Sequence, residues 1–194
     1  GGLGVLAGDW LNEAEDMALP VVGLGLAYHE GYFRQVIDEF GWQHEQPVGF
    51  NPEEHGFELL PQRVKTNVSG RDVTVGIYRF IVEGKRAGIP LYLASTNVPE
   101  NGNPGAWDRQ ITAKLYDEGG GVKGKKDYFR TVQYRILGSG VRLLQAMGYD
   151  FQTYHLNDPH GVFVPLELLL QGLTPEQVRE KIWFTTHTPV EDAF

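Results

Sequence analysis

The sequence has no cysteine, no long apolar run and no excess of basic residues, and each absence narrows the range of functions. Without cysteine there is no disulfide framework, thiolate nucleophile or zinc–thiolate site. No apolar stretch reaches the ~18 residues of a membrane-spanning helix, and no signal peptide is recognisable, so the expected location is the cytoplasm. A net charge of −8 argues against nucleic acid or an anionic membrane as a partner.

What is present is the composition of an ordinary globular domain. Hydrophobic residues make up 41% and charged residues 22% of the 194 positions, enough for one core. Residues 1–194 are therefore interpreted as a single α/β domain, and as a partial one because no strand precedes its opening glycine turn. Residues 47–70, rich in proline, glycine and charge, predict an irregular excursion, and residues 117–126 predict a flexible glycine-rich loop.

Hydrophobic periodicity predicts helices and strands that alternate along most of the chain. Helices are expected over 3–17, 110–116, 126–147, 161–171 and from 174 onward, and strands over 21–28, 71–84, 89–96, 153–156 and 182–186. Thr174 and Gln177 have the spacing of a capping box. This alternation indicates a parallel or mostly parallel sheet, and such sheets bind ligands at the carboxyl ends of their strands.

The first predicted helix has an apolar side and an acidic one. The acidic residues Glu13, Glu15 and Asp16 are expected on its solvated face. The residues that recur at helical spacing, and are therefore expected to face the core, are Leu3, Leu6, Trp10, Ala14 and Met17.

Three polar segments stand at predicted strand-to-loop junctions. They are GGLG at 1–4, HLNDPH at 155–160 and TTHTP at 185–189. A helix that begins in bare glycine backbone suits an anion, because its first N–H groups are unpaired and carry a partial positive charge. With the amide, carboxylate, imidazole and hydroxyl groups of the other two segments, the set suits a sugar phosphate.

Each segment also has an interpretation without a sugar ligand. GGLG fits tight helix–strand packing, and Asp158 is able to cap the following helix from an Asn-Asp-Pro turn. His155, Asp158 and His160 are of types that bind metals, although no further ligand is marked. His187 by itself fits a histidine of the core.

A dinucleotide site is a further alternative. Gly2, Gly4 and Ala7 match the fingerprint G-x-G-x-x-A, and Glu30 follows the next strand, where a ribose-binding acid belongs. Binding of a nicotinamide dinucleotide at this loop would identify a dehydrogenase.

Several motifs, in order along the chain, resemble the α-glucan (glycogen, starch and maltodextrin) phosphorylases. They are GGLGVLAGD, GYFRQ with GWQ, PLYLASTNVPEN followed by WDRQITAKLY, RILGSGVRLLQAMGYD, YHLNDPHGVF and WFTTHTPVE. The resemblance extends from residue 1 to about residue 190 and is greatest to the shorter bacterial and archaeal members. Within it, Asp158 replaces the glutamate that is usual in those members.

The resemblance implies a Rossmann-like, mostly parallel sheet that forms part of the N-terminal domain of a two-domain, B-type glycosyltransferase fold. It implies transfer of a glucosyl unit from α-1,4-glucan to inorganic phosphate, giving glucose 1-phosphate, with pyridoxal phosphate as cofactor. The cofactor lysine of the family lies in the C-terminal domain, and no matching stretch occurs here. The chain alone is therefore expected to be inactive, with the C-terminal domain as its missing partner. Homo-oligomerisation stays open.

The resemblance also implies roles for individual residues. Gly1, Gly2 and Leu3 match a loop whose backbone N–H groups face the substrate phosphate and glucosyl ring, with Gly2 also near the cofactor phosphate. His187 matches the catalytic-site histidine that hydrogen-bonds the glucosyl unit. The other positions assigned to substrate binding are Asn157, Asp158, His160 and Thr188.

Two further functions remain alternatives. A relative of the ADP-glucose-type glucan synthases would share the fold and the GGLG loop, although no lysine is seen before that loop. A non-catalytic glucan-binding module would instead stack sugar on exposed Tyr32, Phe33 and Trp42. Loss of glucan binding on replacement of Trp42 would favour the module.

Overall fold

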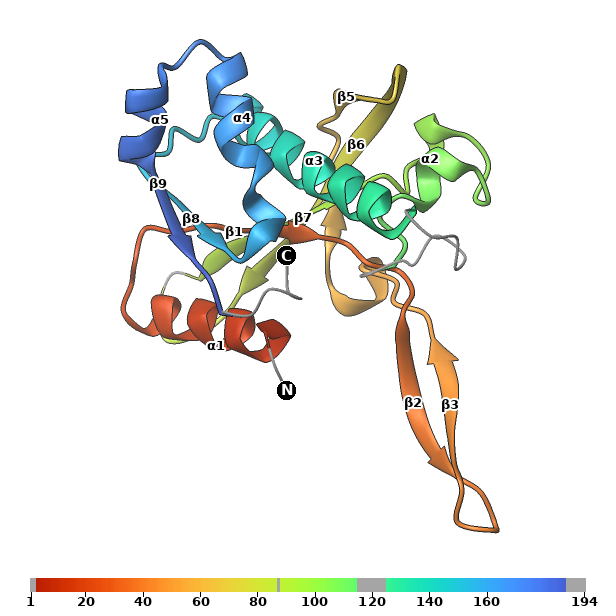
Figure 1. Cartoon of the computed structure of the whole chain (residues 1–194). Coiled ribbons are helices and arrows are strands. Elements are labelled where there is room, and N and C mark those ends of the chain that lie inside the picture. Colours follow the sequence, from red (N-terminus) through yellow and green to blue (C-terminus); the bar gives the residue numbers. More distant parts are fainter. Residues whose placement is uncertain (1–2, 87, 115–124, 188–194) are drawn as a thin grey trace.

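The computed structural model describes residues 3–86, 88–114 and 125–187 as a mixed α/β fold (Figure 1). The helices are α1 (Leu3–Asp16), α2 (Trp107–Gln110), α3 (Lys125–Ala146), α4 (Phe163–Leu170) and α5 (Pro175–Lys181). The strands are β1 (Gly23–Leu26), β2 (Tyr32–Ile37), β3 (Gln43–Val48), β4 (Glu58–Leu59), β5 (Val64–Val68), β6 (Arg71–Val82), β7 (Ile89–Ser95), β8 (Tyr154–Asn157) and β9 (Ile182–Thr185). Within these ranges no helix combines the length and apolar character needed to cross a membrane.

Two predicted irregular segments have different outcomes. Residues 47–70 contain the end of β3, a 3-10 turn at Glu53–His55, and the strands β4 and β5. Of the predicted glycine-rich loop at 117–126, residues 117–124 lie outside the described residues, and the last two belong to α3.

The main sheet is mixed. Its order is β1–β7–β6–β4, with β5 also paired to β6. β1 runs parallel to β7, whereas β6 is antiparallel to β7, β4 and β5. β8 and β9 form a separate parallel pair. The predicted α/β class is confirmed, and the antiparallel part arises because the long strand β6 folds back against both of its neighbours in sequence.

Helices α1 and α3 lie on opposite faces of β1. A Cβ added at Gly23 would lie 3.2 Å from the side chain of Leu11 in α1, and one added at Gly140 in α3 would lie 3.0 Å from Leu24. Because Gly23 and Leu24 are consecutive strand residues, they face opposite sides of the sheet. The sheet therefore lies between α1 on one face and α3 on the other, in a three-layer arrangement.

The main core lies between α3 and the sheet. Ile136 and Leu143 of α3 share one buried cluster with Val75 and Ile77 of β6. In Figure 1, α3 runs across the sheet over most of its length. Its hydrophobic positions confirm the helical periodicity seen in the sequence.

A buried carboxylate fixes the C-terminal end of α1, which corrects the expectation that Glu15 faces solvent. Glu15 is only 2% exposed. Its carboxylate accepts N–H groups from Lys85 (2.8 Å), Arg86 (2.5 Å) and Gly88 (3.3 Å), in the turn between β6 and β7. A charged side chain is buried here because it satisfies several backbone donors of one turn.

The prediction that the apolar face of α1 packs against the core is also largely wrong. Ala14 is buried, but Leu6, Trp10 and Met17 are exposed. The helix therefore rests on the sheet through its C-terminal half and through Leu11, and its apolar stripe stays open along much of its length in the described part of the chain.

The segment between β1 and residue 48 forms a hairpin that the sequence did not reveal. β2 and β3 are antiparallel, all their residues are exposed, and the hairpin projects from the body of the molecule (Figure 1). In its turn, the Asp38 carboxylate accepts the N–H groups of Phe40 and Trp42, each at 2.9 Å, and lies 2.6 Å from His44 Nε2. The His44 contact is the main cause that lowers the pKa of Asp38.

Helix α5 begins with the capping box that the sequence predicts. The Thr174 hydroxyl accepts the N–H of Gln177, and the Gln177 side chain accepts the N–H of Thr174. Replacing Thr174 by alanine removes one of these bonds, so we expect a loss of about 1 kcal/mol in the free energy of unfolding. Urea denaturation would measure it, with Thr174→Ser as the control that retains the hydroxyl; equal loss in both variants would contradict the cap.

Candidate functional site

The loops after β8 and β9 lie side by side because the two strands are parallel. The N–H of Asp158 donates to the carbonyl of Thr185 over 2.9 Å, just beyond the last paired residues. His155, two residue pairs before the end of the ladder, has its Nε2 2.7 Å from the Thr185 hydroxyl. Two of the three polar segments predicted from the sequence are therefore brought together at one carboxyl edge.

Within this edge, Asn157 and Asp158 both bind His187. Asn157 Oδ1 lies 2.6 Å from His187 Nε2, and Asp158 Oδ1 accepts the backbone N–H of His187 over 3.1 Å. Asp158 is 5% exposed and has φ of 58°. Its side chain makes no hydrogen bond to the helical turn that follows, so the capping interpretation is wrong. His187 is exposed and does not belong to the core.

His160 lies deeper in the same loop. Its ring meets the ring of Tyr134 edge-on, with centroids 4.8 Å apart. Burial is the main cause that lowers the pKa of His160; the Asp158 carboxylate opposes this effect and Arg130 adds to it. The neutral imidazole is therefore the favoured form in the folded protein.

This shift predicts a loss of stability in acid. Because the folded-state pKa of His160 lies below its unfolded value near 6.5, the unfolded chain takes up more protons as the pH falls through that value, and stability decreases. We expect His160→Gln to reduce the fall in melting temperature between about pH 7.5 and about pH 5.5. Part of the fall in melting temperature should remain in this variant, because burial also lowers the pKa of His29. An unchanged fall in the variant would contradict the assignment.

Helix α1 lies against this edge. The Trp10 ring lies 6.0 Å from the His155 ring, and in Figure 1 β9 runs toward α1. Leu3 begins α1, whereas Gly1, Gly2 and Thr188 lie outside the described residues. A Cβ at Gly4 would meet nothing within 4 Å, so close packing in the described part of the chain does not account for that glycine.

The carboxyl ends of β1 and β7 carry polar groups to which the sequence analysis gave no role. His29 Nε2 lies 3.3 Å from the Ser95 hydroxyl, and Arg109 Nε donates to Asn97 Oδ1 over 2.8 Å. Burial lowers the pKa of His29. His29 and Asn97 directly follow the predicted strands 21–28 and 89–96, and this position is the signal that would have marked them.

The alternative dinucleotide site loses part of its support. The N–H of Glu30 donates to the carbonyl of Ala113 over 2.8 Å, and its carboxylate lies 3.3 Å from Lys114 Nζ. The acid that was to bind a ribose therefore already has a cationic neighbour.

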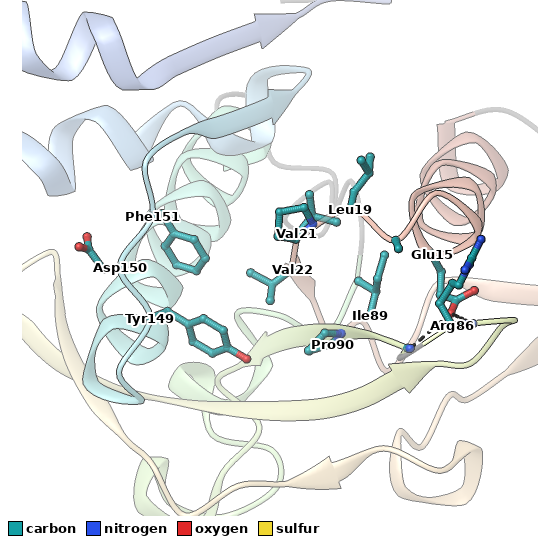
Figure 2. A pocket seen from close by; sticks show the side chains of 13 residues that line it. Glu15, Leu19, Val21, Val22, Arg86, Ile89, Pro90, Tyr149, Asp150 and Phe151 are labelled. Carbon is teal, nitrogen blue, oxygen red and sulfur yellow. Dashed lines mark hydrogen bonds between the residues drawn. The ribbon is translucent and has the colours of Figure 1, made fainter.

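A pocket of about 500 Å³ lies near the amino ends of the strands, away from the polar groups at their carboxyl ends (Figure 2). Figure 2 shows Tyr149 and Phe151 on one side of it, Glu15 and Arg86 on the other, and Val22 between them. Its walls precede β1, β7 and β8, so it opens at their amino ends. It is separate from the polar edge that holds the predicted residues.

No group of three or more potential metal ligands occurs in the ranges that the structure describes. Pyridoxal phosphate needs a lysine amine. Among the lysines with described side chains, Lys65 is exposed on β5, Lys85 pairs with Asp16, Lys114 with Glu30, and Lys181 with the carbonyl of Phe151. None of these lysines is assigned as a cofactor anchor, so no catalytic step is assigned to that group here.

Comparisons with known proteins match the chain to carbohydrate phosphorylases. The model of the family described as carbohydrate phosphorylase matches residues 1–77. The chain is 37% identical to a glycogen phosphorylase of Aquifex aeolicus, over all of this chain and 28% of the relative. It is 34% identical to a maltodextrin phosphorylase of Thermococcus litoralis and 32% identical to a glycogen phosphorylase of Mycobacterium tuberculosis, in each case over 98% of this chain and 23% of the relative.

The chain thus spans about a quarter of the length of these relatives. The match includes the segments that supply α1, the hairpin and the two polar loops, because it covers nearly the whole chain. Over nearly its whole length, the chain is similar to one part of the carbohydrate phosphorylases.

Proposed function

We propose that this chain is part of an α-1,4-glucan phosphorylase, a glycosyltransferase that moves a glucosyl unit from glucan to inorganic phosphate and releases glucose 1-phosphate. Relatives named glycogen and maltodextrin phosphorylase support the substrate class. The two-domain glycosyltransferase fold and pyridoxal phosphate are part of the proposal, with the cofactor lysine outside these residues. The cytoplasm is its proposed location.

The observation that carries the proposal is the joined edge of β8 and β9. There the His187 imidazole lies 2.6 Å from the Asn157 amide oxygen, and the backbone N–H of His187 donates to the Asp158 carboxylate over 3.1 Å. An imidazole that is fixed in this way binds a hydroxyl of a neutral sugar without first having to be ordered. None of these side chains needs to act as a nucleophile.

The proposed roles rest on the resemblance to the phosphorylases, and the geometry of the β8–β9 edge supports the role of His187. His187 holds a hydroxyl of the glucosyl unit, and its backbone carbonyl faces the positive charge that develops in an oxocarbenium-like transition state. His160 is proposed to border the sugar pocket as a neutral ring, and Thr188, which lies outside the described residues, is proposed to bind substrate. Gly1, Gly2 and Leu3 hold phosphate through backbone N–H groups at the start of α1, where the helix dipole favours an anion.

Phosphorolysis by the complete protein tests this proposal. With pyridoxal phosphate, maltodextrin and inorganic phosphate, the complete protein should release glucose 1-phosphate, which phosphoglucomutase and glucose 6-phosphate dehydrogenase convert to a measurable NADPH signal. The 194-residue chain alone should release none, even with free cofactor. Glucosyl transfer from ADP-glucose without phosphorolysis would overturn the proposal in favour of a synthase, and glucan binding without either reaction would favour a binding module.

A further inference from the structure

We propose that Asn157 and Asp158 are positioning residues that fix the loop and the ring of His187, rather than direct sugar ligands. This inference rests on the proposed function, in which His187 binds the glucosyl unit. The geometry of the two residues toward the β9 loop, described next, supports it for each residue separately.

Asp158 joins the β9 loop through both its backbone and its side chain. Its N–H donates to the carbonyl of Thr185 (2.9 Å), and its carboxylate accepts the N–H of His187 (3.1 Å). These bonds enclose the short segment between the last residue of β9 and the histidine. The carboxylate is buried, so it is poorly placed to meet a ligand that arrives from solvent.

The backbone of Asp158 supports the same role. Its φ of 58° is unusual for a residue other than glycine. Such a conformation persists only where the surroundings hold it, and it is common at sites where a precise geometry is needed. Here the strained residue directs its side chain away from the helical turn that follows and toward the neighbouring loop.

Asn157 sets the tautomer of His187. An amide oxygen only accepts hydrogen bonds, so its 2.6 Å contact with Nε2 requires the proton on that nitrogen. In the neutral ring, Nδ1 then carries the free lone pair. Because the ring is exposed, Nδ1 can accept a hydrogen bond from a sugar hydroxyl.

A double-mutant cycle in the complete protein tests this inference. Asp158→Gly removes the carboxylate but suits the positive φ, so the fold should be retained; Asp158→Asn keeps an accepting oxygen. We expect Asp158→Gly to lower kcat/KM for phosphorolysis about 10²-fold, as misplacement of a binding group does, and Asp158→Asn to lower it less than tenfold. In a His187→Ala background, Asp158→Gly should cost much less than in the wild type, because the imidazole that it misplaces is already gone and only the backbone of residue 187 remains to be moved. Additive losses would overturn the inference and indicate direct contact with the sugar.

Asn157 is tested in the same way. Asn157→Asp keeps an acceptor for Nε2–H and should retain most of the activity, whereas Asn157→Leu should not. The Asn157→Leu loss should disappear in the His187→Ala background. A persisting loss would show that Asn157 binds substrate itself.

A readout that does not depend on activity separates this inference from the proposed function. Crystal structures of the complete protein and its Asp158→Gly variant should differ in the position of the His187 loop, and the Asp158→Asn structure should match the wild type. A His187 loop that stays in place without the carboxylate would overturn the inference whatever the enzyme does. Absence of phosphorolysis in the wild type would overturn the proposed function and leave this structural comparison valid.

Discussion

Replacing His187 by alanine in the complete protein is expected to lower kcat/KM for phosphorolysis by on the order of 10²-fold. The imidazole projects from an exposed loop and supports no part of the core, so its loss should act on the reaction and not on the fold. A preorganised hydrogen-bonding group in a catalytic site contributes about this much because it is already oriented when the transition state forms.

The measurement is steady-state kinetics with maltodextrin varied at saturating phosphate. His55→Ala serves as the matched control, since His55 is also exposed but stacks on Phe50 in a 3-10 turn before β4. The control should retain wild-type kcat and KM. If the His187→Ala protein were as active as the wild type, His187 would have no role in the reaction. The β8–β9 edge would then lack the side chain that is proposed to bind the sugar.

The second large effect concerns stability. Replacing Glu15 by alanine is expected to lower the free energy of unfolding by about 2–4 kcal/mol, because three backbone N–H groups lose a charged acceptor. Those donors belong to Lys85, Arg86 and Gly88, in the turn that joins the two central strands β6 and β7.

Urea unfolding followed by tryptophan fluorescence would give this difference. Glu13→Ala is the control, because Glu13 has the same charge, lies on the same helix and is exposed; surface substitutions of this kind change stability by about 0.5 kcal/mol or less. Glu15→Gln, which keeps an acceptor without the charge, should lose less than Glu15→Ala. If Glu15→Ala were no less stable than Glu13→Ala, the carboxylate would not be holding the turn.

These examples show how far the sequence determines the structure. Local signals succeeded for the Thr174 capping box and for the strands β1, β6 and β7 of the main sheet, which depend on neighbours in sequence, whereas β4 and β5 lie in a segment that was predicted to be irregular. The strand-end position of 155–160 and 185–187 also followed from alternation of elements and from the binding rule for parallel sheets.

The failures concern partners that lie far away in sequence. Glu15 has the same local pattern as its acidic neighbours, and only the β6–β7 turn, some 70 residues later, makes it a buried residue. The contacts of Asp158 with His187 cross 29 residues and depend on the parallel pairing of β8 with β9. Periodicity identifies an element, and for α3 also its buried face, but it does not identify the distant residues that an element contacts in the folded protein.

The separate pairing of β8 and β9 has a consequence for local unfolding of the native protein. Among the described residues, these strands share no ladder with the main sheet, and they are held to it through α3, where Val141 contacts Leu156. Such a unit can open as a cooperative segment of its own, at a lower free energy than global unfolding. Backbone amides of β8 should then exchange with deuterium sooner than those of β6, and the proposed sugar site would lose its order before the main sheet does.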